Sequence, residues 1–323
     1  MTDSRYDIVA VGEVLVDLIS DRVVSSLDTA QRFRRFLGGQ VTNVAWNISR
    51  IGGHGAVVGC VGADGFGNYA RQQLRQAGID TDCLSVTPQA PTTVAVNARQ
   101  TRTPDFIIYR GADAHILPED KHHEAVKTSR VVHTSAFALS RDPARSTIME
   151  LLQSAQEHDC LVSLDPNYHP RIWPDVGDAE GLLQEAYQWV DVTKPSLDDC
   201  ARLFGPDPLP RTCAERFLNW GANVVALTMG AEGVLLMTAG GRSYHIKPSD
   251  ATVADVTGAG DAFWAGLLMA LLDGYPPNEA ACVGQIMAEA KISTVGPIAQ
   301  LPDRASLYEQ LNAAKQYSII QLP

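Results

Sequence analysis

The feature that most limits the possible folds of this 323-residue chain is the alternation of short apolar segments with longer amphipathic ones. The apolar segments are rich in Val, which is typical of strands buried on both faces of a parallel sheet. We predict strands at residues 6–11, 56–61, 130–134, 161–164, 190–193 and 224–228, and helices at residues 42–50, 69–77, 143–157 and 214–220. The expected fold is α/β, with a doubly wound, mostly parallel sheet flanked by helices and ligands beyond the carboxyl ends of its strands.

Two stretches interrupt this alternation, at about residues 13–37 and 90–112. The second contains apolar segments at 94–97 and 106–109 on either side of a polar turn, which is the pattern of a β-hairpin. Strands inserted into an α/β domain have to lie outside its sheet, so we expect a small β-sheet lid that excludes water from a site. We therefore expect a single domain over residues 1–323, with the lid segments inserted in its core.

The charge and cysteine content exclude several classes of function. With 26 Lys and Arg against 37 Asp and Glu, the formal net charge is −11, which argues against general nucleic-acid or membrane-surface binding. The six cysteines lack the paired spacing of a zinc site, and neither an export signal nor a membrane-spanning run is recognisable. We expect a cytoplasmic protein with reduced thiols that acts on small molecules.

The most informative motif lies near the C-terminus, where residues 255–263 read DVTGAGDAF ahead of an apolar stretch. The small residues Gly258, Ala259 and Gly260 let an anion approach the N–H groups that open a helix, which makes a pocket suited to phosphate. A carboxylate beside phosphate is repelled unless it acts on the incoming nucleophile, so Asp261 is a candidate general base for a substrate hydroxyl. The alternative is that Asp261 only caps a buried helix.

A second motif, GGQVTNVA at residues 38–45, places two glycines and an amide at the start of a predicted helix. Gly38 and Gly39 permit close approach by a polyhydroxyl ligand, and the Asn43 amide can both donate to hydroxyls and accept from them. Two glycines before a helix are also a common turn. The pairing of this motif with residues 255–263 favours the binding interpretation.

The two motifs, in this order and far apart, resemble the signatures GGxxxNxA and DTxGAGDxF of the ribokinase-like (PfkB-type) carbohydrate kinase family. The first is matched in full, and the second has Val256 where the family usually has Thr. Further familiar segments lie at residues 12–17, 61–67, 165–167 and 228–233, so the resemblance runs from residue 9 to about residue 302. It implies a ribokinase-like fold and ATP-dependent phosphorylation of a primary hydroxyl of a small sugar.

The resemblance also implies roles for individual residues. Asp261 would be the base, and Gly258, Ala259 and Gly260 would form the anion hole. The implied substrate-binding residues are Asp17, Gly38, Gly39, Asn43, Arg110 and Asn167, the nucleotide-binding residues Lys194, Thr228, Gly230 and Gly233, and the ion-binding residues Asp199, Asp255 and Thr257. Asp199 would hold Mg²⁺ through water, and Asp255 with Thr257 a monovalent cation, expected to be K⁺. For Lys194 the alternative is a cation in a solvated loop.

Two departures from the family pattern bear on activity. The NxxE element associated with Mg²⁺ reads SLDD, so the acid survives as Asp199 while the Asn becomes Ser196. Water-mediated metal binding tolerates this change. Many fructokinase-like and ketodeoxygluconate-kinase-like members carry Arg at the position of His169, and a neutral His makes no bidentate contact with phosphate or carboxylate. Arg171 could compensate, although its side chain begins two residues away.

The choice of sugar depends on the lid and its surroundings. Segments 12–17, 109–114 and 165–173 look most like the fructokinase and 2-keto-3-deoxygluconate kinase branches. A carboxylate substrate needs a charge-assisted donor, for which Arg110 and Arg171 are candidates, whereas fructose needs only neutral partners. The His at position 169 and the acidic net charge favour fructose. The alternatives are 2-keto-3-deoxygluconate kinase or another sugar or nucleoside kinase.

Two hypotheses lie outside the kinases. A non-catalytic sugar- or nucleotide-sensing protein is consistent with Ser196 and His169, whereas a dinucleotide-dependent oxidoreductase is disfavoured because no GxGxxG turn follows the first predicted strand. For partners we expect ATP, a small sugar and a second copy of the chain, since exposed lid strands offer edges that pair across a two-fold axis. We expect no nucleic-acid or membrane partner.

Overall fold

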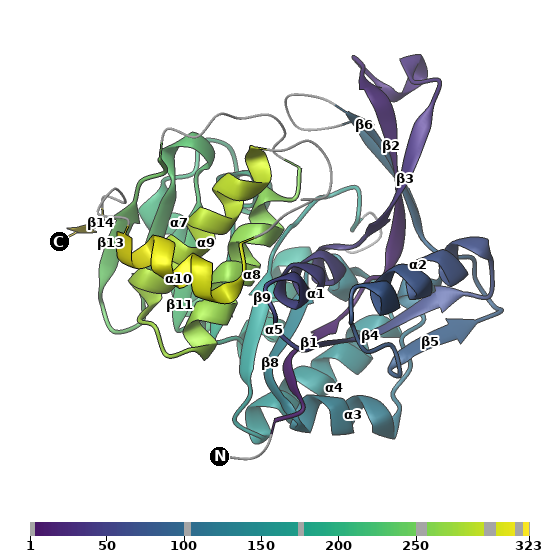
Figure 1. Ribbon diagram of the computed structural model, residues 1–323, viewed down its shortest axis with the longest axis horizontal. Coiled ribbons are helices and arrows are strands. Elements are labelled where there is room, and N and C mark those ends of the chain that lie inside the picture. Colours follow the sequence, from purple (N-terminus) through teal and green to yellow (C-terminus); the bar gives the residue numbers. More distant parts are fainter. Residues whose placement is uncertain are drawn as a thin grey trace.

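The computed structural model describes residues 4–99, 105–173, 178–249, 257–293, 302–313 and 319–322 (Figure 1). Within these ranges the main sheet has ten strands, in the order β14-β13-β12-β11-β10-β9-β8-β1-β4-β5. The strands are β1 (Tyr6–Val11), β4 (Gly55–Gly62), β5 (Leu84–Thr87), β8 (Ser129–Ser135), β9 (Leu161–Asp165), β10 (Val192–Thr193), β11 (Val224–Thr228), β12 (Val234–Thr238), β13 (Ser243–Ile246) and β14 (Ile319–Leu322). All neighbours from β5 to β11 are parallel, which confirms the predicted sheet; β12 to β14 extend it antiparallel.

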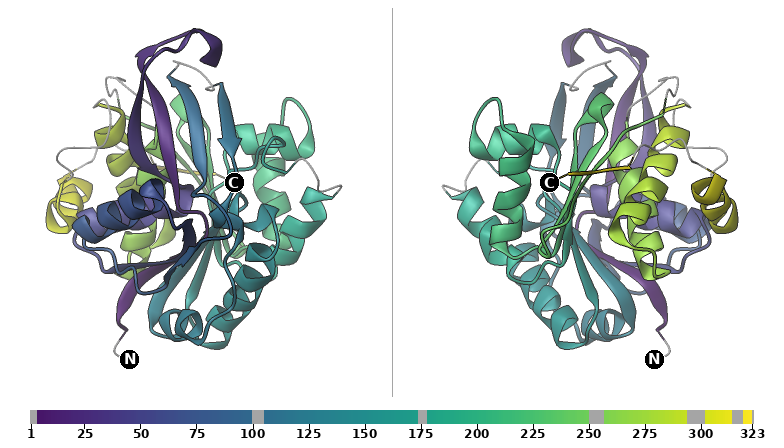
Figure 2. Two further views of the ribbon diagram at one scale, coloured as in Figure 1. Left: turned by 90° about the vertical axis from the view of Figure 1, so that its right-hand side faces the viewer. Right: turned by 90° about the vertical axis from the view of Figure 1, so that its left-hand side faces the viewer.

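Helices cover both faces of this sheet (Figure 2). One face carries α1 (Gln40–Arg50), α2 (Gly65–Gln76), α8 (Ala259–Leu272), α9 (Pro277–Ile292) and α10 (Arg304–Ala313). The other carries α3 (Asp120–Lys127), α4 (Ala144–Glu157), α5 (Ala179–Tyr187), α6 (Leu197–Phe204) and α7 (Pro210–Trp220). Short 3-10 turns occupy Leu27–Thr29, Ala112–Ala114, Ala138–Ser140 and Gly230–Glu232. None of the described helices is long and apolar enough to cross a membrane.

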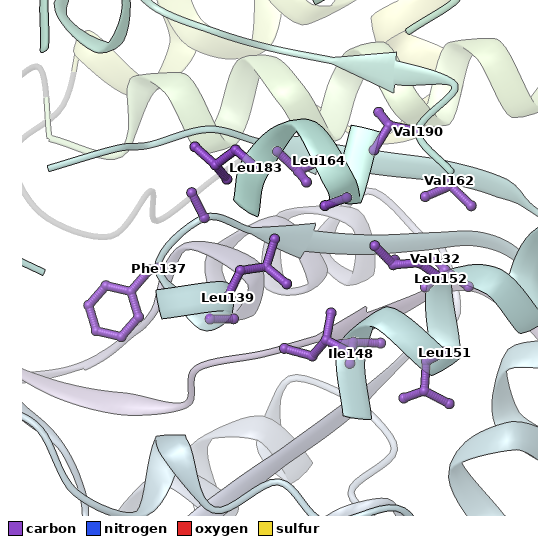
Figure 3. Packing of buried hydrophobic residues seen from close by; sticks show 14 of the residues in the cluster. Val132, Phe137, Leu139, Ile148, Leu151, Leu152, Val162, Leu164, Leu183 and Val190 are labelled. Atoms are coloured by element: carbon purple, nitrogen blue, oxygen red, sulfur yellow. The ribbon is translucent and has the colours of Figure 1, made fainter. Parts of the chain in front are cut away.

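Apolar packing between the helices and the sheet holds these layers together. Figure 3 shows Ile148, Leu151 and Leu152 of α4 beside Val132 of β8 and Val162 of β9. Each of these side chains is at most 1% exposed, and burying one of them stabilises the fold by roughly 1.5–3 kcal/mol. On the opposite face α8 is apolar on all sides, because it packs against α1 and α9 as well as the sheet.

A second sheet is built from the two stretches that interrupt the alternation. Its order is β3-β2-β6-β7, with β2 (Leu15–Val23), β3 (Phe33–Gly38), β6 (Val94–Arg99) and β7 (Phe106–Tyr109). Val94 pairs with Tyr109 in an antiparallel β6–β7 ladder, so the predicted hairpin is confirmed. This sheet, termed the lid, projects beyond the carboxyl end of β1, which leads into β2 (Figures 1 and 2).

The strand order fixes where a ligand site belongs. From β1 the chain passes through the lid to β4 on one side, and later enters β8 on the other side of β1. Such a reversal leaves a crevice beyond the carboxyl ends of the two central strands. The segments that follow β1, β8, β9 and β10 therefore converge beneath the lid.

Candidate active site

A cavity of about 390 Å³ lies at this crevice. It is lined by the segments that follow β1, β8, β9 and β10, by lid residues of β2, β6 and β7, and by the first residues of α1 and α8. The sequence motifs near the two ends of the chain therefore meet in one place. Of the predicted site residues, those that line the cavity are Asp17, Gly39, Asn43, Asn167, Lys194, Gly258, Gly260 and Asp261.

Asp261 is the third residue of α8 and faces this cavity. The helix N-cap is Gly258, in the left-handed conformation with φ of 76°, and no side chain caps the helix. Asp261 instead accepts a 2.8 Å hydrogen bond from Asn43 Nδ2 of α1. Burial raises the pKa of Asp261, against the opposing charge of Lys194, and a raised pKa suits a general base near neutral pH. The capping interpretation of Asp261 is therefore wrong.

Lys194 follows β10 and points toward the start of α8. Its Nζ lies 2.9 Å from Asp165 Oδ2, and both side chains are at most 7% exposed. Burial disfavours the ammonium, but Asp165 outweighs burial and the pKa of Lys194 is raised. A Cβ at Gly260 would lie 3.3 Å from Nζ, so the Lys194 ammonium lies close to the backbone that opens α8. The solvated-loop interpretation of Lys194 is therefore wrong.

A chain of buried hydrogen bonds holds Asp165 from below. Gln40 Nε2 donates to Asp165 Oδ2 at 2.8 Å, so the Gln40 amide oxygen faces His133 Nε2 at 3.0 Å and accepts from it. His133 Nδ1 then lacks a proton and accepts from Ser163 Oγ at 2.8 Å. Ser163 Oγ in turn accepts from Trp264 Nε1 at 2.8 Å.

These five residues, Trp264, Ser163, His133, Gln40 and Asp165, are termed the floor network. All are at most 6% exposed, and each hydrogen bond fixes the proton position in the next. Burial, reinforced by the charge of Lys194, lowers the pKa of His133 to about 3, so the imidazole is neutral. The floor network joins α8 to the Asp165–Lys194 pair through side chains that have one mutually consistent orientation.

The glycine motif brings the lid and α1 into close contact. Gly39 has φ of 107°, and any side chain there would collide with the Glu13 carbonyl oxygen. A side chain at Gly38 would collide with the Asp17 carboxylate. Glu13 is 1% exposed and accepts from Gln40 N at 2.7 Å and from Ser135 Oγ at 2.8 Å. The two glycines therefore permit close packing of protein groups around the cavity.

Asp17 and Asn97 form the polar part of the lid wall. They lie on the paired strands β2 and β6, and Asn97 Nδ2 donates to Asp17 Oδ1 at 3.0 Å. Burial raises the pKa of Asp17 to about 7, and the charge of Asp261 acts in the same direction. Both side chains have remaining hydrogen-bonding capacity for a polyhydroxyl ligand.

Arg110 lies outside the cavity lining, contrary to the sequence-based prediction. Its Nε donates to Asp113 Oδ2 at 2.8 Å, and its Nη1 donates to Ser140 Oγ at 2.8 Å. The guanidinium also stacks on the Phe137 ring, 4.1 Å from its centroid. Asp113 is only three residues away and forms an ion pair with the Arg110 guanidinium. Arg110 is therefore held against the Phe137 ring rather than in the cavity lining.

The predicted nucleotide-binding residues Thr228, Gly230 and Gly233 lie beside the cavity without lining it. They occupy the turn from β11 to β12, where Thr228 N donates to the Pro195 carbonyl at 2.9 Å. This contact places the turn next to the segment that follows Lys194. Their part in nucleotide binding remains a prediction.

Asp199 has a structural task that sequence reasoning did not foresee. Its Oδ2 accepts from Ser196 N at 2.9 Å and from Ser196 Oγ at 2.6 Å, in a capping box at the start of α6. Its Oδ1 accepts from Tyr168 N at 2.8 Å. These bonds do not fit direct ligation of Mg²⁺, whereas contact through water remains a prediction.

The two residues predicted to hold a monovalent cation give little structural information. Asp255 lies outside the described residues, and Thr257 is exposed.

Sequence reasoning also missed Arg202, which lines the cavity near His169. His169 lines the cavity with its ring 4.7 Å from that of Phe106, and its Nδ1 accepts from Arg171 N at 3.1 Å. Burial and the nearby Arg202 lower the pKa of His169 to about 4, so the ring is neutral. Arg171 is 62% exposed, donates to the Phe106 carbonyl and does not belong to the cavity lining. Arg202 of α6 does line the cavity.

Some of the missed residues carry a sequence signal. Gln40 stands inside the glycine motif, and Asp165 opens the DPN segment. Asn97 shares a face of β6 with Ala95, which also lines the cavity. Arg202, by contrast, is one charge on an ordinary amphipathic helix, so nothing local singles it out.

Comparison with known proteins agrees with this geometry. The family model described as pfkB family carbohydrate kinase matches residues 5–304. A protein of Thermoanaerobacterium thermosaccharolyticum named ATP-dependent 6-phosphofructokinase is 34% identical over 301 residues, which cover 93% of this chain and 92% of that protein. The structure of Halothermothrix orenii fructokinase superposes with a TM-score of 0.74 and 36% identity, covering 90% of this chain and 100% of that one.

A more distant structure shows the same fold. A putative ribokinase II from E. coli, in complex with ATP and Mg²⁺, has a TM-score of 0.81 at 20% identity and covers 95% of this chain and 99% of that one. The fold class predicted from the sequence is confirmed by these similarities.

Proposed function

Because the chain belongs to the pfkB family of carbohydrate kinases, we propose that it transfers the terminal phosphoryl group of ATP to a primary hydroxyl of fructose. The observation that carries the proposal is the half-buried carboxylate of Asp261, which Asn43 orients at the start of α8, beside Gly258 and Gly260. The 36% identical fructokinase supports fructose as the acceptor.

Each step of this transfer has a group in the cavity. The sugar hydroxyl gives its proton to Asp261 while its oxygen bonds to the terminal phosphorus, and the bond from that phosphorus to the bridging oxygen of ADP breaks. The N–H groups of the first turn of α8 and the ammonium of Lys194 stabilise the charge on the group in transfer. Asp17 and Asn97 hold other hydroxyls of the sugar.

The proposal includes two ions, Mg²⁺ bound with ATP and a K⁺ near the start of α8. Mg²⁺ supplies neutralisation of phosphate charge when ATP is bound, and it keeps several waters of its own. Asp199 would contact these waters rather than the metal, because its Oδ2 already caps α6 and its Oδ1 accepts from Tyr168 N. We assign a K⁺ site to Asp255 and Thr257 on the family resemblance, and an assay with and without K⁺ tests it.

We also propose a cytoplasmic homodimer of one kinase domain per chain, joined through the lid. Both edge strands of the lid present apolar side chains: Phe33 on β3 is 38% exposed, and Ile107 and Tyr109 on β7 are 47% and 63% exposed. Such edges are suited to pairing with a second copy. All six cysteines are free and buried, which is compatible with a reducing cytoplasm.

A sugar that carries an anionic group is the second candidate acceptor. The observation that favours it is the guanidinium of Arg202 in the cavity lining. The relative named ATP-dependent 6-phosphofructokinase points to a sugar phosphate. The same guanidinium is suited to the carboxylate of 2-keto-3-deoxygluconate.

The test is ADP release with ATP and Mg²⁺ across fructose, fructose 6-phosphate, 2-keto-3-deoxygluconate, ribose and a set of nucleosides. The highest kcat/KM on fructose would support the proposal. The highest value on an anionic sugar would replace fructose by the second candidate. Absence of ADP release with every acceptor, from protein that binds ATP in calorimetry, would contradict the kinase assignment.

A further inference from the structure

Two cations line the cavity within the described residues, and their charges are neutralised to different degrees. Lys194 lies 2.9 Å from the buried carboxylate of Asp165. Arg202 donates from Nη1 to the carbonyl of Tyr168 at 3.2 Å, while the two carboxylates of its own helix are 3.7 and 3.8 Å from its nitrogens. Those two separations are too long for hydrogen bonds. Asp198 and Asp199 form ion pairs with Arg202 without taking up its N–H groups, so Arg202 keeps donors for a ligand.

The shape of the Arg202 side chain suits an oxyanion. A guanidinium has five N–H donors in a planar fork, which matches two oxygens of a phosphate or carboxylate group. The one hydrogen bond to Tyr168 fixes the side chain without using the fork fully. With 25% of the side chain exposed, Arg202 is accessible to a group inside the cavity.

The charge balance of the cavity favours a cation besides Lys194 for an anionic group that enters. His169, beside Arg202, is neutral because burial and the charge of Arg202 lower its pKa to about 4, and its Nδ1 accepts from the Arg171 backbone. Arg171 itself bonds the lid and lies outside the lining. The carboxylates that line the same cavity are Glu13, Asp17, Asp165 and Asp261.

We propose that Arg202 binds the phosphate oxygens of a substrate of the kinase reaction, and so determines which acceptors or nucleotides are used. This inference rests on the proposed function. Phosphate can reach Arg202 from two sources, the terminal phosphate of ATP or a phosphate carried by the sugar, and the chemistry of recognition is the same for both.

The experiment compares Arg202→Gln with Arg171→Gln. Both changes remove one guanidinium next to His169, but only the first removes a cation from the cavity lining. Steady-state kinetics with ATP are measured for fructose and for fructose 6-phosphate, and thermal unfolding checks that each variant is folded. Arg202→Lys, which keeps the charge without the fork, serves if the glutamine variant does not fold.

The expected result is a fall in kcat/KM of roughly 10- to 100-fold for Arg202→Gln, the loss of one charge-assisted contact, with Arg171→Gln within threefold of wild type. A loss confined to fructose 6-phosphate would assign the contact to the sugar phosphate. An equal loss with both acceptors, together with a higher KM for ATP, would assign it to the nucleotide. Wild-type kinetics of folded Arg202→Gln on both acceptors would overturn the proposal.

A binding measurement separates this inference from the proposed function. If wild type turns over no acceptor, the kinase proposal fails, and calorimetric titration with ATP and with fructose 6-phosphate still tests Arg202. Weaker binding of either compound to Arg202→Gln than to Arg171→Gln would uphold the contact. Equal binding to both variants, or no binding to wild type, would overturn it.

Discussion

The floor of the cavity and the lid above it are built in opposite ways. The floor network is at most 6% exposed, and its side chains hold one another in a single orientation. The lid exposes Val23, Phe33, Ile107 and Tyr109 by 38% to 63%. In the proposed mechanism the groups that act on the phosphoryl group are thus located on the packed core. Asp17 and Asn97, proposed to hold hydroxyls of the sugar, are located on the thin sheet of the lid.

Among changes that compare the floor with the lid, removal of the Lys194 cation should have the largest effect. Lys194→Met should lower kcat by roughly 100- to 1,000-fold, because it deletes a donor to the group in transfer. It also leaves Asp165 buried without its partner, so the variant should unfold at a lower temperature. The double variant Lys194→Met/Asp165→Asn should regain thermal stability but not kcat. Recovery of both quantities would show that Lys194 has a structural role only.

Interrupting the floor network from a distance should have a smaller effect. His133→Asn removes the donor to the Gln40 amide oxygen, and a buried acceptor without a partner costs about 1–3 kcal/mol. We expect kcat to fall roughly tenfold with KM nearly unchanged. His133→Gln can extend an N–H to the same oxygen and should retain most of kcat. Equal kcat values for the two variants would contradict a positioning role.

A change in the lid should act on binding instead. Phe106→Ala removes the ring that packs against His169 on the cavity wall. The KM for the acceptor should rise roughly threefold to tenfold, which corresponds to one lost apolar contact, while kcat and the unfolding temperature change little. A large loss of kcat without a change in KM would erase the distinction between lid and floor.

Asp17 offers a smaller test, through the pH dependence of stability. Its pKa is about 7 in the folded protein and near 4 in an unfolded chain, so between these values the folded state binds more protons. Folding stability therefore falls as the pH rises from 4 to 7 and levels off above 7. In Asp17→Asn the unfolding temperature should drop less between pH 5 and pH 8, by roughly 2 °C or more. An unchanged drop would refute the raised pKa.

The parallel sheet and the lid hairpin could be predicted well from the sequence, because the signals for these elements are local. The runs at residues 6–11 and 224–228 coincide with β1 and β11, because Val-rich segments buried on both faces leave little choice of structure. The hairpin pairing of Val94 with Tyr109 follows from alternation around a polar turn. Of the antiparallel strands beyond β11, β12 contains an apolar run at residues 234–237 as strong as that of β11, whereas β13 carries polar residues and gives a weaker signal.

The cavity could be predicted only where a motif concentrated its residues. Asp261 and Asn43 belong to such motifs and meet at 2.8 Å. The two arginines show where prediction from local sequence fails. Arg110 follows the lid strand β7 directly, yet its hydrogen bond to Asp113 holds it outside the cavity lining. Arg202 reaches the cavity because α6 packs beside it. Which charge faces a ligand is decided by tertiary partners that sequence spacing does not display.

The most direct test of the central claim is the rate of ADP release by Asp261→Asn on the best acceptor. The substitution keeps the size of the side chain and removes the base. We expect folded protein that binds ATP as wild type does, with kcat lower by roughly 100- to 10,000-fold. A folded variant that binds ATP and retains kcat within tenfold of wild type would contradict the assignment of Asp261 as the base.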